Sequence, residues 1–328
     1  MAFSKKKKLS PIKRILAVFC WLTMCGALGW FGTSLGMTPY LMTIIKHPSV
    51  IFNPNPAAQF ALEQVNILVL GTDVDYNNQN QVIHTQARSD SIFVVRCNFE
   101  KGKERIDAIS IPRDTIVEIP GHDRQKINAA HALGGPELAK QTVEQALGIQ
   151  IDQVLVLSFD GFRKLIDSIG GLYVTVDKKM DYDDNWGNLH IHLQPGYQWL
   201  DGYKAMGFVR FRHTDDDFHR IKRQQGFVTS FKTQLTKQSP LRYKGILESI
   251  RKSISGTVND DQLVELAAWI RNLSSTKIQM NTIPIRSTGR LSFEIDEQKA
   301  QQMLKEMNFF SSFSASSGIT RSEPETKL

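Results

Sequence analysis

The run NILVLG at residues 66–71 begins the folded part of this chain of 328 residues. It is short and continuously apolar, which is typical of a strand buried on both faces. SIFVVR at 91–96 and VLVLSF at 154–159 have the same character, and PELAKQTVEQALG at 136–148 has the apolar spacing of a helix. Strands that alternate with helices predict an α/β fold, with a substantially parallel sheet covered on both faces.

The rest of the chain continues this alternation. The stretch 177–200 is rich in Gly, Asn and Asp and predicts a hairpin excursion from the sheet. Apolar patterning predicts further strands at 105–111, 172–176, 208–212 and 277–285, and helices at 160–170, 217–235, 260–273 and 297–307.

The N-terminal region has the pattern of a membrane anchor. Residues 15–37 are an uncharged run of 23, long enough to cross about 30 Å of hydrocarbon. Basic residues precede this run without acidic ones, which favours a cytoplasmic N-terminus and an uncleaved signal-anchor. We therefore expect a single-pass plasma-membrane protein. Its predicted parts are a cytoplasmic basic tail (1–14), a transmembrane signal-anchor (15–37), a connector (38–63), an extracytoplasmic catalytic domain (64–310) and a disordered tail (311–328).

The charge distribution argues against a nucleic-acid-binding surface. The formal net charge is +7, but six basic residues and no acidic ones lie in the first 37 residues. The remainder of the chain therefore has a net charge of only +1, and the basic cluster is juxtamembrane. The three cysteines do not form a disulfide framework, because Cys20 and Cys25 lie within the predicted span.

Carboxylates and arginines follow or precede several predicted strands. Asp73 comes directly after the strand that begins at 66, and Arg113 after the strand that ends at 111. If these strands are parallel, both side chains lie at the same end of the sheet, where α/β folds bind ligands. Arg88 and Asp90 share one face of an extended segment. The alternatives are a turn or helix-cap role for Asp73 and a surface ion pair for Arg88 and Asp90.

The segment from 208 to 235 adds further basic residues. On the predicted strand 208–212, Arg210 and Arg212 share one face and repel each other unless an anion lies between them or the strand is at an edge. On the helix that follows, Arg220 and Gln224 fall within the apolar stripe. We interpret both as anion ligands near the positive helix N-terminus, whereas Arg223 is predicted to point into solvent.

His190 and His192 alternate with Leu189, Ile191 and Leu193. This alternation predicts that both histidines line the exposed face of a hairpin, and it favours that role over metal binding.

The motifs, in this order, resemble the LytR–CpsA–Psr family of cell-wall glycopolymer transferases. The resemblance spans about residues 64–310 and includes NILVLGTD, RSDSIFVV, ISIPRDTIVEIPG, KINAAHALGG and GYKAMGFVRFRH…DFHRIKRQQ. It implies a three-layer α/β/α sandwich with a mixed central sheet and a hydrophobic groove for a polyprenyl chain. It also implies transfer of a glycan 1-phosphate from a polyprenyl-pyrophosphate carrier to a peptidoglycan sugar hydroxyl.

The resemblance also implies roles for individual residues. By position, Asp73 and Asp90 hold Mg²⁺, with Mn²⁺ as an alternative, and Asp73, Arg113 and Asp114 are the catalytic residues. The general base is open among Asp73, Asp90 and Asp114. The chain departs from the family at Asp75, where an arginine is usual, and in a longer link between Asp73 and Asp90. Pyrophosphate contacts are implied for Arg88, Arg113, Arg210, Arg212, Arg220 and Gln224.

Two other functions are compatible with these motifs. A polyprenyl-pyrophosphate pyrophosphatase would use the same phosphate ligands with water as the acceptor. A non-catalytic wall-binding or regulatory module would need no catalytic residues at all. DNA regulation is the least favoured function, because no recognition helix is apparent and the predicted anchor places the domain outside the cell.

Overall fold

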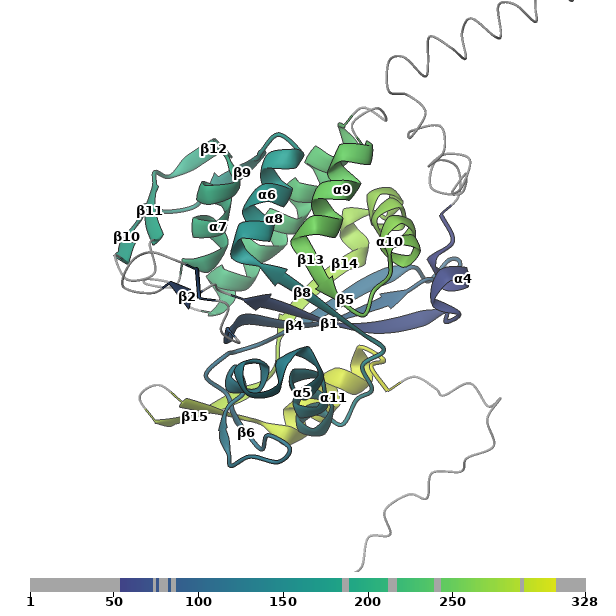
Figure 1. Ribbon diagram of the computed structural model, residues 1–328, viewed down its shortest axis with the longest axis vertical. Helices are drawn as coiled ribbons and strands as arrows, with labels where there is room; N and C mark the ends of the chain where they lie inside the picture. The colour runs from purple at the N-terminus through teal and green to yellow at the C-terminus, as the bar shows by residue number, and fades with distance from the viewer. Residues whose placement is uncertain are drawn as a thin grey trace, which may run out of the picture. The chain divides into compact units, whose positions relative to one another are not determined.

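A six-stranded mixed sheet forms the centre of the fold in this computed structural model (Figure 1). Its strand order is β13-β8-β1-β4-β5-β14. Neighbouring strands are parallel in the pairs β1/β8 and β5/β14 and antiparallel in β13/β8, β1/β4 and β4/β5. The strands are β1 (Gln64–Thr72), β4 (Ser89–Asn98), β5 (Arg105–Ile111), β8 (Gln153–Ser158), β13 (Ile254–Gly256) and β14 (Ile278–Thr282).

The structure describes residues 54–72, 75–76, 82–83, 87–184, 189–211, 217–238, 243–289 and 292–310. The predicted basic tail, signal-anchor and C-terminal tail lie outside these ranges, as do Asp73 and Arg212. Among the described helices, none is long and apolar enough to cross a membrane.

Helices cover both faces of the sheet. They are α4 (Pro56–Phe60), α5 (Ala129–Leu147), α6 (Phe159–Ser168), α7 (Gly202–Arg210), α8 (Asp217–Thr236), α9 (Tyr243–Ser253), α10 (Asp260–Asn272) and α11 (Glu297–Glu306), with a short 3₁₀ turn, η2, at Ser275–Lys277. Helices α5 and α11 lie on one side of the sheet in Figure 1, and the others lie on the opposite side. The predicted α/β fold is confirmed. Its sheet is mixed, as the family resemblance implied, and not substantially parallel, as the alternation of strands and helices predicted.

Short two-stranded sheets surround this centre. The pairs are β2 (Asp75–Tyr76) with β3 (Val82–Ile83), β6 (Ile116–Val117) with β7 (Gln125–Lys126), β9 (Leu172–Val176) with β12 (Gly196–Leu200), β10 (Met180–Asp184) with β11 (Leu189–Leu193), and β15 (Ile285–Gly289) with β16 (Ser292–Ile295). The hairpin excursion predicted at 177–200 is therefore confirmed.

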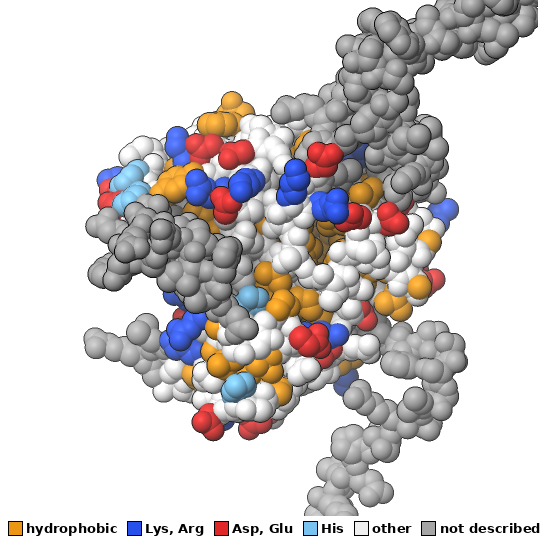
Figure 2. Space-filling model, in the orientation of Figure 1, with side chains coloured by type: hydrophobic (Ala, Val, Ile, Leu, Met, Phe, Trp, Pro, Cys, Tyr) orange, Lys and Arg blue, Asp and Glu red, His pale blue; other side chains and the backbone are white. Residues whose placement is uncertain are grey.

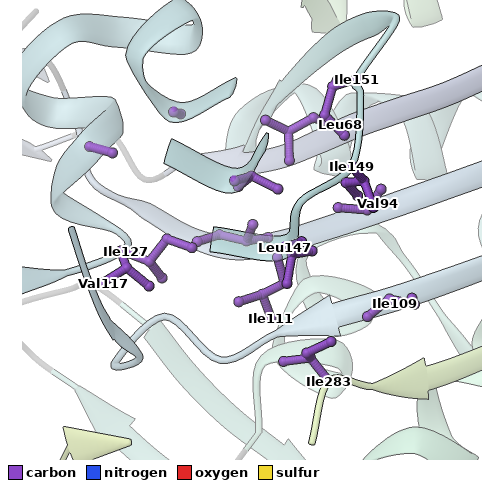
Figure 3. Close-up of a cluster of buried hydrophobic side chains, with 14 of the residues drawn as sticks. Leu68, Val94, Ile109, Ile111, Val117, Ile127, Leu147, Ile149, Ile151 and Ile283 are labelled. Carbon is purple, nitrogen blue, oxygen red and sulfur yellow. The ribbon is translucent and has the colours of Figure 1, made fainter. Parts of the chain in front are cut away.

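The α5 face of the sheet holds the largest buried cluster (Figure 3). Leu68 of β1, Val94 of β4 and Ile109 of β5 are inaccessible to solvent and pack with Leu147 of α5. We call this surface the α5 face. The opposite surface, the α10 face, is fully buried only at its far end, where Cys97 packs among residues of α4 and α10.

One predicted strand is a helix. FVRFR at 208–212 was expected to join the sheet, but residues 202–210 form α7. Asp201 is its N-cap and accepts a hydrogen bond of 2.8 Å from the backbone N–H of Lys204. Ala205 and Phe208, three positions apart, are buried in the cluster between α6, α8 and β9. Burial of this helical face outweighs the strand propensity of alternating Phe and Val.

Candidate active site

The sheet topology brings three distant segments to one end of the sheet. Thr72 at the end of β1 pairs with Ser89 at the start of β4, and Ile92 of β4 pairs with Ile111 at the end of β5. Asp90 therefore lies beside the segment that follows β5, which contains Arg113. The ends of β1 and β5 lie together as the strand ends predicted, whereas the start of β4 meets them only because β4 runs antiparallel to both.

Asp90 lies between two arginines from different elements. Its Oδ1 accepts a hydrogen bond of 2.6 Å from Nη1 of Arg113, and its Oδ2 is 3.5 Å from Nη2 of Arg210. The side chains of Asp90 and Arg210 are about one-fifth exposed, and that of Arg113 is 38% exposed. These guanidinium groups remain open to a ligand while a carboxylate holds them in place.

Burial and neighbouring charges shift the pKa of Arg113 in opposite directions. Burial lowers the pKa of this guanidinium, but the charges of Asp90 and Asp114, together with hydrogen bonds to them, raise it above its ordinary value. Arg113 is therefore a permanent cation, as an anion-binding role requires.

Arg210 reaches the site from α7 and not from a strand. It occupies the last turn of the helix, and its guanidinium lies 4.1 Å from the ring centroid of Phe159 at the start of α6. This cation–π contact fixes the side chain next to Asp90. Arg210 therefore lies beside Asp90 at the end of the sheet, as predicted. The reason given for it, repulsion between two arginines on one strand face, does not apply, because residue 210 is helical.

Asp114 and Lys126 form a second ion pair beside the first. Nζ of Lys126 donates a hydrogen bond of 2.7 Å to Oδ1 of Asp114, whose Oδ2 is 3.6 Å from Nε of Arg113. The described site therefore combines three cations (Arg113, Lys126, Arg210) with two carboxylates. Sequence reasoning missed Lys126, although KINAAHALGG was one of the motifs that resembled the family.

The segment after Lys126 fixes the backbone of the site. The N–H of Ile127 donates to the carbonyl of Thr115 (2.8 Å), and the carbonyl of Asn128 accepts from the N–H of Ser89 (3.4 Å). His131 of α5 is 2.6 Å from the carbonyl of Ala87 through its Nδ1. These bonds join the starts of β4 and α5 to the segment that follows β5.

Gln224 lies where the helix phase predicted, whereas Arg223 does not. Gln224 lines a cavity of about 70 Å³ together with Asp90, Asp114 and Phe93, as its place in the apolar stripe indicated. Arg223 is buried, and its Nη2 donates a hydrogen bond of 2.5 Å to the carbonyl of Phe211. The prediction of a solvated Arg223 is wrong, because the end of α7 covers this side of α8.

The remaining predicted ligands are only partly described. Arg88 is exposed and directly precedes β4. Arg220 lies in the first turn of α8, but its side chain lies outside the described part, as do Asp73 and Arg212 altogether. The predicted roles of these residues stay predictions.

The described carboxylates are chemically suited to Mg²⁺, which prefers oxygen ligands and often takes only one or two carboxylates plus phosphate oxygens. Asp90 and Asp114 line the same cavity, and both remain partly exposed. Within the described ranges, no three acidic, His or Cys side chains gather into a metal-binding group. Two carboxylates at one cavity are compatible with such an ion, whose remaining ligands are usually water and phosphate oxygens.

Apolar side chains on the α10 face remain half-buried between this site and the closed far end of the face. They are Val69 of β1, Phe93 and Val95 of β4, and Leu155 of β8. Phe93 also lines the cavity that contains Asp90. A charged site and an incompletely covered apolar surface thus lie side by side.

The histidines that were expected on the hairpin lie outside this site. His190 and His192 of β11 are partly exposed and pair with carboxylates of β10. Their Nδ1 atoms are 2.6 Å from Asp183 and 2.7 Å from Asp181, respectively. The predicted exposed histidine face is confirmed.

Comparison with known proteins identifies the family. Residues 45–309 match the LytR_cpsA_psr family. The chain belongs to this family. The regulatory protein MsrR of Staphylococcus aureus (strain COL) is 30% identical over 229 residues, which are 69% of this chain and 66% of MsrR. The polyisoprenyl-teichoic acid–peptidoglycan teichoic acid transferase TagT of Bacillus subtilis (strain 168) is 30% identical over 249 residues, 75% of this chain and 76% of TagT.

Solved structures of LytR_cpsA_psr proteins share the fold. TagV of B. subtilis has a TM-score of 0.61 at 28% identity and covers 75% of this chain and 96% of TagV. TagT bound to LI-WTA has a TM-score of 0.58 at 27% identity and covers 76% of this chain and 91% of TagT. The chain spans about two-thirds of the length of MsrR and about three-quarters of that of the curated TagT sequence.

Proposed function

We propose that this chain is a membrane-anchored, extracytoplasmic phosphotransferase. It moves a glycan 1-phosphate from a polyprenyl-pyrophosphate carrier to a sugar hydroxyl of peptidoglycan. The observation that supports this best is the position of Asp90, Arg113 and Arg210 beside the half-buried apolar side chains of the α10 face. The transferase name of the relative TagT agrees with it.

The two surfaces fit the two parts of such a donor. Val69, Phe93, Val95 and Leu155 offer apolar area to a polyprenyl chain, which is stabilised by leaving water. Guanidinium groups bind phosphate oxygens bidentately, so the pyrophosphate lies among the cations at the end of the sheet. We assign this contact to Arg88, Arg113, Arg210, Arg212, Arg220 and Gln224, and we add Lys126.

The reaction is a displacement at phosphorus. The acceptor hydroxyl oxygen attacks the phosphorus that bears the glycan, and the bond from that phosphorus to the bridging oxygen breaks. Polyprenyl phosphate leaves, and the hydroxyl proton passes to a carboxylate. Asp73, Asp90 and Asp114 are the candidates for this base. Arg113 and Arg210 stabilise the charge that develops on the phosphoryl oxygens.

We further propose Mg²⁺, or Mn²⁺, as the cofactor. Asp90 and Asp73 would hold the ion together with substrate oxygens. When bound, the ion neutralises charge on the pyrophosphate and complements the arginines.

Release of polyprenyl phosphate tests the function. The full chain in detergent is incubated with a lipid-pyrophosphate glycan, Mg²⁺ and peptidoglycan strands. We expect wild-type turnover and a loss of about 100-fold or more in Arg113→Ala. Arg124→Ala is the matched control, because Arg124 is exposed and pairs with Glu294 outside the site. Full activity in Arg113→Ala would refute the assignment of Arg113 to the active site.

The same assay separates the alternatives. A pyrophosphatase releases polyprenyl phosphate at the same rate without acceptor and forms no glycan–peptidoglycan product. A binding or regulatory module retains the lipid but releases nothing. The predicted signal-anchor at 15–37 and the outward orientation are tested separately, with a reporter fused to the C-terminus.

A further inference from the structure

Aromatic side chains gather on the outer face of the β9–β12 sheet. Tyr173, Tyr197 and Trp199 are 49%, 72% and 44% exposed. The other large hydrophobic side chains that are exposed in the described residues lie apart from one another: Leu62 between α4 and β1, Leu133 on α5 and Phe310 after α11. Figure 2 shows hydrophobic side chains at the surface over β9 and β12, at the top of the view. Contiguous exposed apolar area of this kind commonly marks a binding surface.

The register places these rings on one face. Trp199 lies directly opposite Tyr173, and Tyr197 lies opposite Thr175. The alternate residues of β9, namely Leu172, Val174 and Val176, are buried in the cluster beneath. We call the outer surface formed by Tyr173, Thr175, Tyr197 and Trp199 the aromatic face.

The rings of the aromatic face are held in fixed positions. The Tyr173 and Tyr197 rings stack with centroids 5.3 Å apart and an interplanar angle of 19°. Nε1 of Trp199 donates a hydrogen bond of 3.1 Å to the carbonyl of Gly170. The indole also occupies the place of a side chain at Gly171, where an added Cβ would lie 2.5 Å from Nε1. A ligand therefore meets a surface that loses little side-chain freedom on binding.

The chemistry of this face favours a sugar. Its four side chains are uncharged, and three of them carry hydroxyl groups at their tips. A pyranose ring has C–H bonds on one face, which are attracted to the negative face of an aromatic ring, and hydroxyl groups at its rim that bond to polar tips. Nucleic acid or anionic lipid would instead require cations on the face itself.

A rigid helix connects the aromatic face to the candidate active site. β12 ends at Leu200, Asp201 caps α7, and the last turn of α7 carries Arg210, which pairs with Asp90. The backbone N–H of Gly202 donates a hydrogen bond of 2.7 Å to Asp167 of α6, which fixes the start of the helix. A helix of this length spans about 14 Å, a distance that a short oligosaccharide covers.

From these observations we infer that the aromatic face binds the glycan strand of the acceptor, by stacking of its sugar rings on Tyr173, Tyr197 and Trp199. The inference rests on the proposed function for the identity of the glycan. One sugar stacks here while another extends along α7 and presents its hydroxyl near Arg210.

Binding to glycan strands without any lipid donor tests the inference. The probe is soluble, uncrosslinked peptidoglycan composed of alternating N-acetylglucosamine and N-acetylmuramic acid, and the protein is the full chain in detergent. We expect Tyr197→Ala to weaken binding by about tenfold, and Tyr197→Phe to weaken it less. Phe310→Ala is the control, because Phe310 is similarly exposed in the segment after α11 and its loss leaves binding unchanged. Tyr197 is the most exposed of the three rings, so its removal preserves folding better than removal of Trp199.

Transfer kinetics provide the second measurement. Tyr197→Ala raises KM for the strands, while the KM for the lipid donor and kcat remain unchanged. Unchanged strand binding and acceptor KM overturn the inference and leave the proposed function intact. Binding that depends on Tyr197 in a protein without transferase activity supports the aromatic face and refutes the proposed function instead. Loss of dimerisation or of vesicle binding in Tyr197→Ala, with strand binding intact, also overturns the inference.

Discussion

The two faces of the central sheet differ in how completely they are covered. On the α5 face, Leu68, Val94 and Ile109 are inaccessible to solvent beneath α5 and α11. On the α10 face, Val69 and Val95 remain half-buried in the middle of their strands, although the far end is closed. One face therefore supplies stability, whereas the other keeps apolar area that the proposed lipid chain would cover.

Adjacent valines of β4 provide a direct test of this difference. Val94→Ala removes methyl groups from the closed α5 face, and we expect it to lower the free energy of unfolding by about 2–3 kcal/mol. Val95→Ala makes the same chemical change on the α10 face and should cost less than about 1 kcal/mol, because Val95 is only partly buried. Chemical denaturation of the full chain in detergent measures both values. Equal losses would contradict the distinction between the faces.

Larger side chains at the same positions sharpen the comparison. Val94→Phe overpacks the α5 face and should cost about 1–3 kcal/mol. Val95→Phe projects into incompletely filled space, so its effect on stability is smaller, and it instead raises KM for the lipid-linked donor by occupying the place of the chain. An unchanged KM for the lipid-linked donor in Val95→Phe would show that the lipid chain does not bind to this surface.

Cys97 distinguishes the closed end of the α10 face from its open end. Burial raises the pKa of this thiol to about 12, with Asp107 adding to the effect. Since the thiolate is the reactive form, we expect no alkylation of Cys97 at pH 8 in the native protein and complete alkylation in denaturant. A cysteine introduced by Val95→Cys should react in the native state. Mass spectrometry of the modified peptide reads both positions, and rapid native modification of Cys97 would show that the far end also opens.

The smallest effect concerns the β10–β11 hairpin, which belongs to neither face. The hydrogen bond to Asp181 raises the pKa of His192, with the charges of Asp183 and Asp181 adding to it. Because the folded pKa lies above the unfolded one, the resulting stabilisation is present below the unfolded pKa and is lost as pH rises through the folded pKa. An NMR titration should show a raised His192 pKa that returns toward its ordinary value in Asp181→Asn. The same titration midpoint in both proteins would exclude the pairing.

The sequence predicted the elements that depend on local pattern. The apolar runs of β1, β4 and β8 and the stripe of α8 are each readable within one segment, and Gln224 was placed correctly from helix phase alone. The rule that ligands gather at strand ends correctly brought the ends of β1 and β5, and so the segment that contains Arg113, to one end of the sheet. These predictions hold because they require only the period of an element and its limits.

The predictions that failed concern residues whose position depends on contacts with distant segments of the chain. α7 is a helix because Ala205 and Phe208 are buried against other elements, and Arg223 is buried because the carbonyl of Phe211 lies over it. Lys126 was missed because only the paired strands β6 and β7 bring it to Asp114. No local pattern contains this information.

By itself, then, the sequence determined the α/β class, the strand ends at which charged side chains meet, and the helical stripe that contains Gln224. Only the tertiary structure decided the reversed direction of β4, the helical origin of Arg210 and the half-coverage of the α10 face. Periodicity is a property of one segment, whereas strand direction, burial and ion pairing are properties of segments that meet after folding.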